Sequence, residues 1–388
     1  MNNSKLQVIA FYLPQFYPIK ENDEWWGKGF TEWTNVAKAK PLFKGHNQPR
    51  IPGDLGFYDL RVPEVRELQV ELAKEAGVTA FCYWHYWFGN GRRLLETVFD
   101  EVLEHGKPDF PFCLGWANHS WYAKTWDKDS FKNDKLLIEQ TYPGIEDAKK
   151  HFEFLVKAFK DNRYLKIEGK PFLFIFDPMA LPKEYIDLFH KWAHEAGFPG
   201  LYLVGNINVY EDKQLYLNKG FNAVLTNRTF KASVNNFEKF YKVNLVNLSR
   251  RLRNKSFIID KLLTLRKSWL TARSKTRPTI VDFAQYYKGL VTQEEYSETS
   301  IPQILPQWDH TPRSGNKGIA WVNTTPEFFK LHAIDALNAV KEKQNPIIIL
   351  KSWNEWGEGN YMEPDLTYGK GFIFALRDAI KSIQNTTN

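Results

Sequence analysis

Two glutamates three residues apart, Glu355 and Glu358, are the residues best suited to chemistry in this sequence. They follow the apolar, β-branched run 347–350, which predicts a short buried strand. Two tryptophans and two glycines stand around them, and loops after strands carry the chemistry of barrel enzymes. A pair of carboxyl groups beside aromatic side chains is the usual equipment for cleaving a glycosidic bond. A solvated acidic loop with packing tryptophans is the alternative. We favour catalysis because such residues seldom share a loop for solubility alone.

Two aspartates, Asp177 and Asp309, end other predicted strands and are rival acids for the same reaction. Asp177 precedes Pro178 and could instead shape a turn, and Asp309 could instead bind a sugar hydroxyl. A general acid needs a raised pKa, which burial between aromatic rings and a neighbouring carboxylate both supply. The spacing of Glu355 and Glu358 is compatible with carboxyl groups a few ångströms apart, as a retaining mechanism requires.

The chain is rich in aromatic residues, which make up 16% of the sequence and include 14 tryptophans. Flat aromatic rings stack on the apolar faces of sugars, although they also fill protein cores. We therefore predict that residues following the strands bind sugar, with a purely structural role as the alternative for each. They are Tyr12, Trp33, Trp84, His85, Trp116, Asn118, His119, Asp177, Asn206, Gln307, Trp308, Asp309, Asn354 and Trp356. The five tryptophans of this set are the predicted walls of the cleft.

Regular elements must hold these residues, and eight apolar runs predict strands at 6–13, 78–84, 110–116, 171–176, 201–204, 223–225, 303–306 and 347–350. Helical spacing of apolar residues predicts helices at 64–76, 94–105, 146–159, 183–196, 213–218, 328–343 and 371–383. Pro306 removes a backbone donor from the seventh strand. Eight strands that mostly alternate with helices predict an α/β fold, a (β/α)8 TIM barrel, in one catalytic domain covering residues 1–388.

One segment, 228–277, does not fit the repeat and is predicted to be a basic helical insertion between strands 6 and 7. It holds 14 Lys and Arg but two acidic residues, a net charge of +12, whereas the whole chain carries +7. Its apolar residues suggest an amphipathic helix whose basic face could contact an anionic membrane surface or an acidic glycan. A solvated insertion packed on the barrel is the alternative. Nucleic-acid binding is not expected, because no helix-turn-helix, zinc or single-strand-binding motif accompanies the charge.

The sequence predicts neither a cofactor nor a metal site. Cys82 and Cys113 lie in apolar stretches and are expected to be buried thiols. No histidine pair with metal-ligand spacing and no carboxylate-rich calcium loop is present. The N-terminus lacks the features of a signal peptide, and no apolar run reaches the ~18 residues of a membrane span. A cytoplasmic location is therefore expected, at the periphery of the inner membrane if the insertion binds lipid.

Several motifs spread along the chain point to one family. They read FYLPQFYPIKENDEWWGKGFTEW, NQPRIPGDLGFYDLR, YWHYWF, CLGWANHSW, ILPQWDHTPR and SWNEWGEGNYMEPD. Together they resemble the glycoside hydrolase family 99-like domains of bacterial polysaccharide clusters, often labelled WbsX-type. The resemblance runs from about residue 7 to residue 365 and implies a (β/α)8 barrel.

More distant relatives in this resemblance, the endo-α-mannosidases, carry the motif Glu-Trp-His-Glu-Gly, whereas residues 355–359 read Glu-Trp-Gly-Glu-Gly. The resemblance implies Glu355 as general base and Glu358 as general acid. In those relatives the base removes the proton of the sugar's own 2-hydroxyl, which gives a 1,2-anhydro sugar and net retention. Gly357 in place of histidine, and His119 in place of an acid or amide, imply a different sugar.

Three functions are compatible with these features. The first is a retaining endo-glycosidase or transglycosidase that acts on an α-linked, mannose-type bacterial surface glycan. The second is a glycosyltransferase of O-antigen or capsular polysaccharide biosynthesis, although the sequence shows no Rossmann-type nucleotide fingerprint. The third is a barrel that binds glycan without cleaving it, which the intact acid pair argues against. In each case the partner is an oligosaccharide or polysaccharide.

Overall fold

The computed structural model of the chain describes residues 5–123, 135–208, 211–228 and 277–384. Its centre is a parallel sheet of largely buried strands, rich in apolar side chains as expected where both faces are covered. The strands of this sheet are β1 (Gln7–Tyr12), β2 (Ala80–His85), β3 (Phe112–Trp116), β7 (Lys170–Ile175), β8 (Tyr202–Asn208), β9 (Ala223–Asn227), β11 (Ser300–Ile301), β12 (Gln303–Ile304) and β14 (Ile347–Leu350).

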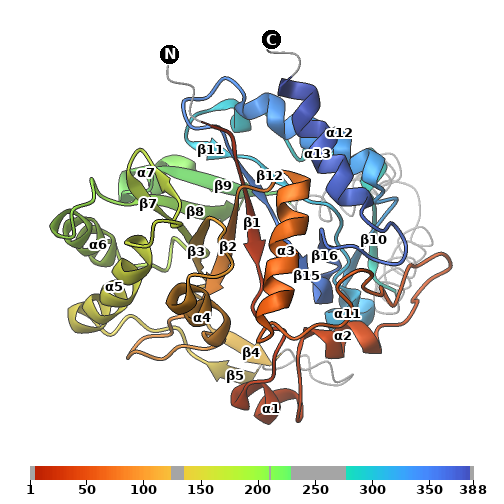
Figure 1. Cartoon of the computed structure of the whole chain (residues 1–388), viewed down its shortest axis with the longest axis horizontal. Helices are drawn as coiled ribbons and strands as arrows, with labels where there is room; N and C mark the ends of the chain where they lie inside the picture. Colours follow the sequence, from red (N-terminus) through yellow and green to blue (C-terminus); the bar gives the residue numbers. More distant parts are fainter. Residues whose placement is uncertain (1–4, 124–134, 209–210, 229–276, 385–388) are drawn as a thin grey trace, which may run out of the picture.

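The sheet closes into a barrel through one stretch of chain, 300–304. β11 pairs in parallel with β9, and β12, one residue further on, pairs in parallel with β14. Pro302 separates the two pieces because it has no N–H to donate, but its carbonyl oxygen accepts a 3.1 Å hydrogen bond from the Ile349 N–H. The predicted (β/α)8 fold is thus confirmed (Figure 1). The seventh barrel strand begins three residues earlier than predicted and ends before Leu305.

Helices cover the outside of the barrel (Figure 1). They are α3 (Pro63–Ala76), α4 (Thr97–His105), α5 (Ile145–Phe159), α6 (Lys183–Glu195), α7 (Lys213–Lys219), α12 (Pro326–Val340) and α13 (Gly371–Gln384). α3 illustrates how the sequence sets their limits. Its first residue is Pro63, its buried face includes Val70 and Ala73, and Gly77 ends it with a left-handed φ of 85°. α13 packs against both α3 and α12.

Shorter elements surround the barrel strands, several of them at the carboxyl end, towards which β1 runs in Figure 1. They are α1 (Lys20–Trp26), α2 (Glu32–Lys38), α10 (Phe283–Tyr286), α11 (Thr311–Ser314), and the 3-10 turns η1 (Tyr287–Gly289), η2 (Gln293–Tyr296), η3 (Gly315–Lys317) and η4 (Trp356–Glu358). Paired short strands are β4 (Trp121–Ala123) with β5 (Lys135–Ile138), β6 (Lys166–Ile167) with β7, β10 (Thr279–Asp282) with β13 (Ile319–Val322), and β15 (Asn354–Glu355) with β16 (Asn360–Tyr361).

Two predictions about the organisation of the chain lie beyond what the structure describes. The basic insertion falls almost wholly outside the described residues, so its helical structure and its contact with an anionic surface stay predictions, which salt-dependent binding to anionic vesicles would measure. Its first residue, Arg228, is described; it is buried and forms ion pairs with Glu294 and Glu295 at 2.5 and 2.8 Å. The organisation of residues 1–388 as one catalytic domain likewise stays a prediction.

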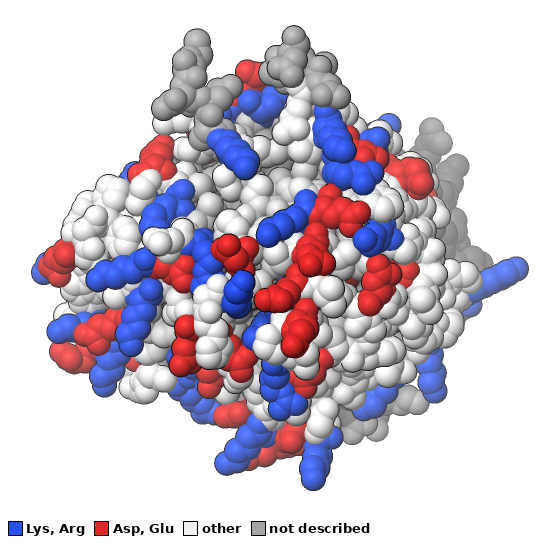
Figure 2. Space-filling model, in the orientation of Figure 1, with Lys and Arg blue, Asp and Glu red and all other residues white. Residues whose placement is uncertain are grey.

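The described surface is mixed in charge. Figure 2 shows Lys and Arg interspersed with Asp and Glu over the face of the molecule that carries α3. Cys82 and Cys113 are free thiols buried side by side on β2 and β3, as expected. Within the described ranges, no helix is both long and apolar enough to cross a membrane.

Candidate active site

Glu355 and Glu358 lie on a small hairpin that follows β14. After the strand, the chain forms β15, the turn η4 and the antiparallel β16, so both glutamates stand at the carboxyl end of the barrel. Gly359 closes the turn with a left-handed φ of 55°, and a Cβ there would lie 2.9 Å from the Asp309 Cβ and 3.1 Å from its backbone nitrogen. A glycine is therefore required by both conformation and space. The two side chains are 16% and 17% exposed, so substrate can reach them.

Arg313, on α11, joins the two glutamates. Its Nη1 lies 3.3 Å from Glu355 Oε1 and 2.6 Å from Glu358 Oε1, while its Nη2 lies 3.0 Å from the buried carboxylate of Glu32 on α2. Because Nη1 contacts Oε1 of both glutamates, these two oxygens are at most about 5.9 Å apart, the sum of the two contact distances. The carboxyl groups of inverting glycosidases are ~6.5–9.5 Å apart, and those of retaining ones ~5–5.5 Å. The distance between these two oxygens is compatible with a retaining pair.

Other polar groups contact Glu358 as well. His310 Nε2 is 3.5 Å from Glu358 Oε1, and Lys351 Nζ is 3.9 Å from Glu358 Oε2. The indole nitrogen of Trp308 donates a weak hydrogen bond to the same Oε2 at 3.4 Å, and Lys351 Nζ lies 4.7 Å from the centre of that indole ring. Glu358 thus lies among donors and cations.

These surroundings give the two glutamates opposite protonation behaviour. Burial, followed by the negative charge of Glu358, raises the pKa of Glu355 to about 7, and the more distant Arg313 and Lys351 only partly oppose this. Burial also acts to raise the pKa of Glu358, but Arg313, His310 and Lys351 together outweigh it and lower that pKa well below its usual value. Below about pH 7 the pair therefore holds one proton, on Glu355. This is the reverse of the distribution implied by Glu358 as the general acid.

Asp309, the predicted rival acid, lies behind the hairpin rather than facing the barrel mouth. Its carboxylate is buried; it lies 2.8 Å from His46 Nε2 and accepts hydrogen bonds from Gln48 Nε2 and from the Thr311 backbone and hydroxyl. Its own N–H donates to the Glu358 carbonyl at 2.7 Å. Burial acts to raise the pKa of Asp309, but the bonds from His46 and its other neighbours lower it to about 2. We therefore assign Asp309 to holding the hairpin rather than to binding sugar.

Two of the predicted cleft walls, Trp116 and Trp356, belong to the core instead. Both side chains are 1% exposed. Trp356 donates through its indole nitrogen to the buried Glu363 at 2.6 Å, and its ring stacks on Tyr361 with centroids 3.7 Å apart. Trp116 donates to the backbone oxygen of Trp87 at 3.1 Å. A buried ring has no free face for a sugar, so the prediction of walls is wrong for these two.

Trp308 is also almost fully buried, with 2% exposure, and packs edge-on against Trp321 at 5.7 Å. Its indole nitrogen contacts Glu358, and its ring lies beneath Lys351. Trp33 and Trp84 are partly exposed and also pack against the core, so their role as walls stays a prediction.

Two strand-end residues, Tyr12 and His85, are likewise buried in the core. The Tyr12 hydroxyl donates to Gln69 Oε1 at 2.6 Å, and His85 Nε2 lies 2.9 Å from His151 Nε2. Burial lowers the pKa of both histidines, so they are neutral and suited to packing. The structure therefore corrects the prediction that these two residues bind sugar.

Gln307 and Asn354 are buried as well and serve the loops that carry the site. Gln307 Oε1 accepts a hydrogen bond from the buried Arg50. Asn354 exchanges two hydrogen bonds with the backbone of Leu13, accepting at 2.8 Å and donating at 3.0 Å, which ties the hairpin to the end of β1. Their side chains point into the protein, so we assign them to positioning and not to sugar binding.

Four other predicted residues do meet at one place on the barrel mouth. Asn118 exchanges two hydrogen bonds with the backbone of Asp177, donating at 2.7 Å and accepting at 2.8 Å. Asn206 donates to the backbone oxygen of Phe176, whose ring is 38% exposed and lies 4.6 Å from the ring of His119. Burial lowers the pKa of His119, although Asp177 opposes this. This group, Asn118, His119, Phe176, Asp177 and Asn206, is called the β3–β8 rim below.

Several site residues were not predicted. The two glutamates are surrounded by Arg313, His310, Lys351 and Glu32. Tyr86 also lies nearby: burial raises its pKa most, and the negative charge of Glu355 raises it further. Arg313 and His310 stand within the motif ILPQWDHTPR, which was the available signal. Glu32 lies 281 positions from Arg313, and no sequence pattern pairs them.

Partly exposed aromatic side chains beyond the predicted set also flank the site. Trp121, on β4, packs edge-on against Tyr86 with ring centroids 5.1 Å apart and against Trp25 at 5.9 Å. Trp84, predicted as a wall, lies 5.9 Å from Phe176 of the β3–β8 rim. Among the described residues, no three His, Cys, Asp or Glu side chains have a geometry that could hold a metal ion.

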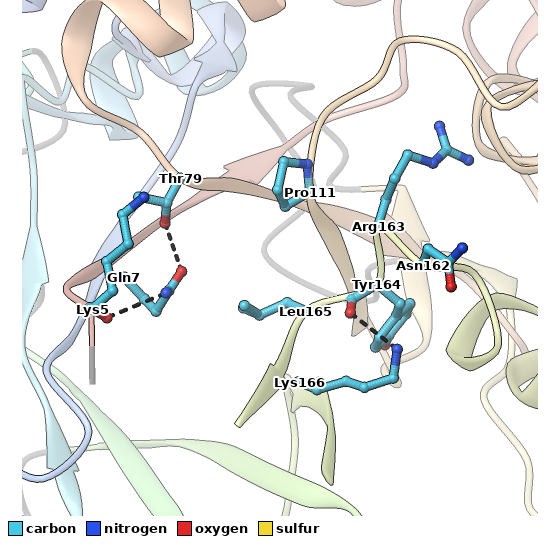
Figure 3. A pocket seen from close by; sticks show the side chains of 9 residues that line it. All are labelled: Lys5, Gln7, Thr79, Pro111, Asn162, Arg163, Tyr164, Leu165 and Lys166. Carbon is cyan, nitrogen blue, oxygen red and sulfur yellow. Dashed lines mark hydrogen bonds between the residues drawn. The ribbon is translucent and has the colours of Figure 1, made fainter. Parts of the chain in front are cut away.

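A hollow of about 280 Å³ lies at the other end of the barrel, beside the starts of β1 and β2 (Figure 3). Its lining is Lys5, Gln7, Thr79, Pro111, Asn162, Arg163, Tyr164, Leu165 and Lys166, which includes no carboxyl group. Arg163 is already held by Asp161. Barrel enzymes work at the carboxyl ends of their strands, so we place the site at the glutamate pair.

Comparison with known proteins identifies the family. The family model described as Glycosyltransferase WbsX matches residues 8–376. The chain belongs to this family. Among curated relatives, proteins described as uncharacterized protein WxcX from two strains of Xanthomonas campestris pv. campestris are 32% and 31% identical over 380 residues. These alignments cover 96% of this chain but 49% of each relative, so the WbsX-family chain spans about half the length of the relatives it matches.

Solved structures show a similar fold at low sequence identity. A protein described as glycoside hydrolase-like has a TM-score of 0.55 and 15% identity, covering 97% of this chain and 94% of its own. The GH99 endo-α-mannosidase of Bacteroides thetaiotaomicron, solved with BIS-TRIS-propane, has a TM-score of 0.55 and 12% identity, covering 98% of both chains. The resemblance inferred from the motifs is thus confirmed for the family and for the fold.

Proposed function

We propose that this WbsX-family protein is a glycan-processing enzyme that cleaves or transfers an α-linked sugar with retention of configuration, using Glu355 and Glu358. The observation that carries the proposal is the single Arg313 nitrogen shared by the two carboxyl groups, which brings an oxygen of each to within the separation expected of a retaining pair. The GH99 endo-α-mannosidase fold supports an α-mannose-type oligosaccharide or polysaccharide as the substrate class.

Two assignments of roles are compatible with this geometry. In the resting site Glu355 holds the proton, which suits it to be the general acid, with Glu358 as the nucleophile or base. In the assignment implied by the motif resemblance, Glu355 is the base for the sugar 2-hydroxyl, and the proton must pass to Glu358 when substrate binds. The second route gives a 1,2-anhydro sugar and the first a covalent glycosyl-enzyme.

Transfer rather than hydrolysis is the second candidate function. The family description names a glycosyltransferase. Two cations, Lys351 and Arg313, converge on Glu358 together with the imidazole of His310. Positive charge of this kind would also stabilise a phosphate leaving group. The acceptor would then be a second glycan hydroxyl.

A substrate panel tests the proposal. The protein should be incubated with free and lipid-linked α-mannose-type oligosaccharides, with and without nucleotide-sugars, and the anomeric configuration of new products should be followed by NMR. Retained products support the proposal, and products that require a nucleotide-sugar support the transferase. Inverted products, or tight glycan binding without any turnover, would contradict it and favour the non-catalytic barrel.

Turnover should fall as pH rises through about 7, because the singly protonated pair then loses its remaining proton from Glu355. On the acid side the pair stays singly protonated until pH approaches the lowered pKa of Glu358, so turnover should persist to the limit of folding. Both role assignments give this profile, because it reports the protons of the pair as a whole. Turnover that rises continuously from pH 6 to 9 would contradict it.

Trp121→Ala and Trp116→Ala should separate the exposed aromatic surface from the core. Trp121 is partly exposed beside Tyr86, so its loss should weaken oligosaccharide binding about tenfold while the fold survives. Trp116 is 1% exposed, and its loss should lower the free energy of unfolding by about 3–5 kcal/mol. Calorimetric titration and denaturant unfolding measure the two quantities. Unchanged binding in Trp121→Ala would remove it from the cleft.

A further inference from the structure

The side chain that orients Arg313 comes from a distant part of the chain. Glu32 is the first residue of α2, and its side chain is 3% exposed. Its Oε2 lies 3.0 Å from Arg313 Nη2 and 3.3 Å from Arg313 Nε, a side-on contact that uses two of the three guanidinium nitrogens. The remaining nitrogen, Nη1, is the one that faces Glu355 and Glu358. Glu32 therefore determines which edge of the guanidinium meets the pair.

Gly357, between the two glutamates, makes room for this arrangement. A Cβ at position 357 would lie 1.9 Å from Glu32 Oε2 and 3.0 Å from Arg313 Nε. The backbone there is not left-handed, so the glycine is required for space and not for conformation. Position 357 is also where the motif of the endo-α-mannosidases has histidine. In this chain the buried carboxylate of Glu32 lies where the Cβ of any other residue at position 357 would be.

We propose that Glu32 is a positioning residue that holds Arg313 closer to Glu358 than to Glu355 and so strengthens the hold of Glu355 on the proton of the pair. Any effect of Glu32 on catalysis rests on the proposed function, but its effect on the position of Arg313 does not. Without Glu32, the fork of Arg313 would be free to turn and to pair evenly with both glutamates. Arg313 Nη1 now lies 2.6 Å from Glu358 and 3.3 Å from Glu355, and without Glu32 these two distances would become similar.

Charged and titratable groups face the pair from several elements. Arg313 is on α11, and His310 is the residue before that helix. Glu32 is on α2. Lys351 follows β14, and Tyr86 follows β2. Lys351 and His310 contact Glu358 and do not depend on Glu32. Glu32 acts on Glu355 in two ways: its own negative charge favours the protonated form, and its hold on Arg313 keeps that cation closer to Glu358 than to Glu355.

Glu32→Gln tests the proposal in the resting protein, without substrate. Glutamate side chains labelled with ¹³C at the carboxyl carbon report each titration by NMR, and Glu355→Gln identifies the Glu355 signal. We expect the Glu355 midpoint to move down by about one pH unit or more in Glu32→Gln, because a negative charge is removed and Arg313 is released. An unchanged midpoint in a folded variant would overturn the proposal.

A double-mutant cycle covers the case in which Glu32→Gln folds poorly. Gly357→Ala alone should displace the Glu32 carboxylate and shift the Glu355 midpoint in the same direction as Glu32→Gln. In a Glu32→Ala background the same Gly357→Ala change should add little, because the clash is gone and the released Arg313 can move. Gly359→Ala is the matched control, since its Cβ would meet the backbone of Asp309 and Glu32→Ala cannot relieve it. Additive effects of Glu32→Ala and Gly357→Ala would overturn the proposal.

Activity distinguishes this inference from the proposed function. If the enzyme is active, Glu32→Gln should also move the alkaline limb of its pH profile down by the same amount. If no glycan is turned over by the wild-type protein, the proposed function fails while the NMR titration still decides the role of Glu32.

Discussion

Glu355→Gln and Glu358→Gln should each lower turnover of an unactivated glycoside by about 10²–10⁴-fold, the usual contribution of general acid or base catalysis. Both side chains lie at the barrel mouth with their oxygens held by Arg313, so an amide keeps the shape but cannot exchange the proton. Initial rates measure the effect. Glu342→Gln, at an exposed position before β14, is the matched control and should retain full activity.

Activated substrates separate the two role assignments. A glycosyl fluoride needs no proton on its leaving group, so the variant of the general acid should keep turning it over, whereas the variant of the base or nucleophile should not. Rescue of Glu355→Gln would assign the acid to Glu355, in agreement with the resting protonation, and rescue of Glu358→Gln would assign it to Glu358, as the motif resemblance implies.

The sugar 2-hydroxyl separates the two intermediates. Activated substrates that lack this hydroxyl must stop on the anhydro-sugar route, because the hydroxyl is itself the nucleophile, but can continue on the covalent route. Full activity of both amide variants would place the chemistry elsewhere, with Asp177 of the β3–β8 rim as the next candidate.

Asp309→Ala should lower the free energy of unfolding by about 3–5 kcal/mol, because it leaves His46, Gln48 and Thr311 buried without their acceptor. The matched control is Asp177→Ala, because Asp177 is partly exposed and its carboxylate accepts one described backbone bond, from Ala180. That change should cost about 0.5–1.5 kcal/mol. Denaturant unfolding compares the two.

The pH dependence of unfolding gives an independent check on Asp309. Its pKa is lowered in the folded protein to about 2, so its stabilising contribution is present above its unfolded pKa, near 4, and is lost as pH falls through about 2. The wild-type protein should therefore lose about 2 kcal/mol more than Asp309→Ala over that window. Equal losses in the two proteins, together with a small effect at neutral pH, would show that Asp309 does not hold the hairpin.

Local pattern in the sequence was enough for the barrel. Each strand is a short apolar run and each outer helix has one apolar face, and these signals depend on neighbouring residues alone. The ends of a strand do not follow from the apolar run where a single residue changes its pairing with neighbouring strands. Pro302 splits the seventh strand into two pieces, one for each neighbour, which the run 303–306 does not reveal.

The chemistry of the site was only partly contained in the sequence. The spacing of Glu355 and Glu358 identified the pair because both residues are on one hairpin. The same reasoning placed Trp116, Trp356 and Asp309 at the sugar, since residues that follow strands lie near the mouth. Whether such a side chain points into the cleft or into the core depends on what packs against it, and those neighbours are far away in the chain.

The sequence by itself thus determined the fold and the placing of Glu355 and Glu358 on one loop after a barrel strand, because both follow from short-range spacing. Only the tertiary structure decided which glutamate holds the proton, since that depends on Coulomb interactions with charges brought together by folding. Arg313 reaches Glu358 across 45 positions and Glu32 across 281, and the missing side chain of Gly357 leaves the space in which they meet. No local pattern records distances of that kind, because they exist only once the barrel has closed.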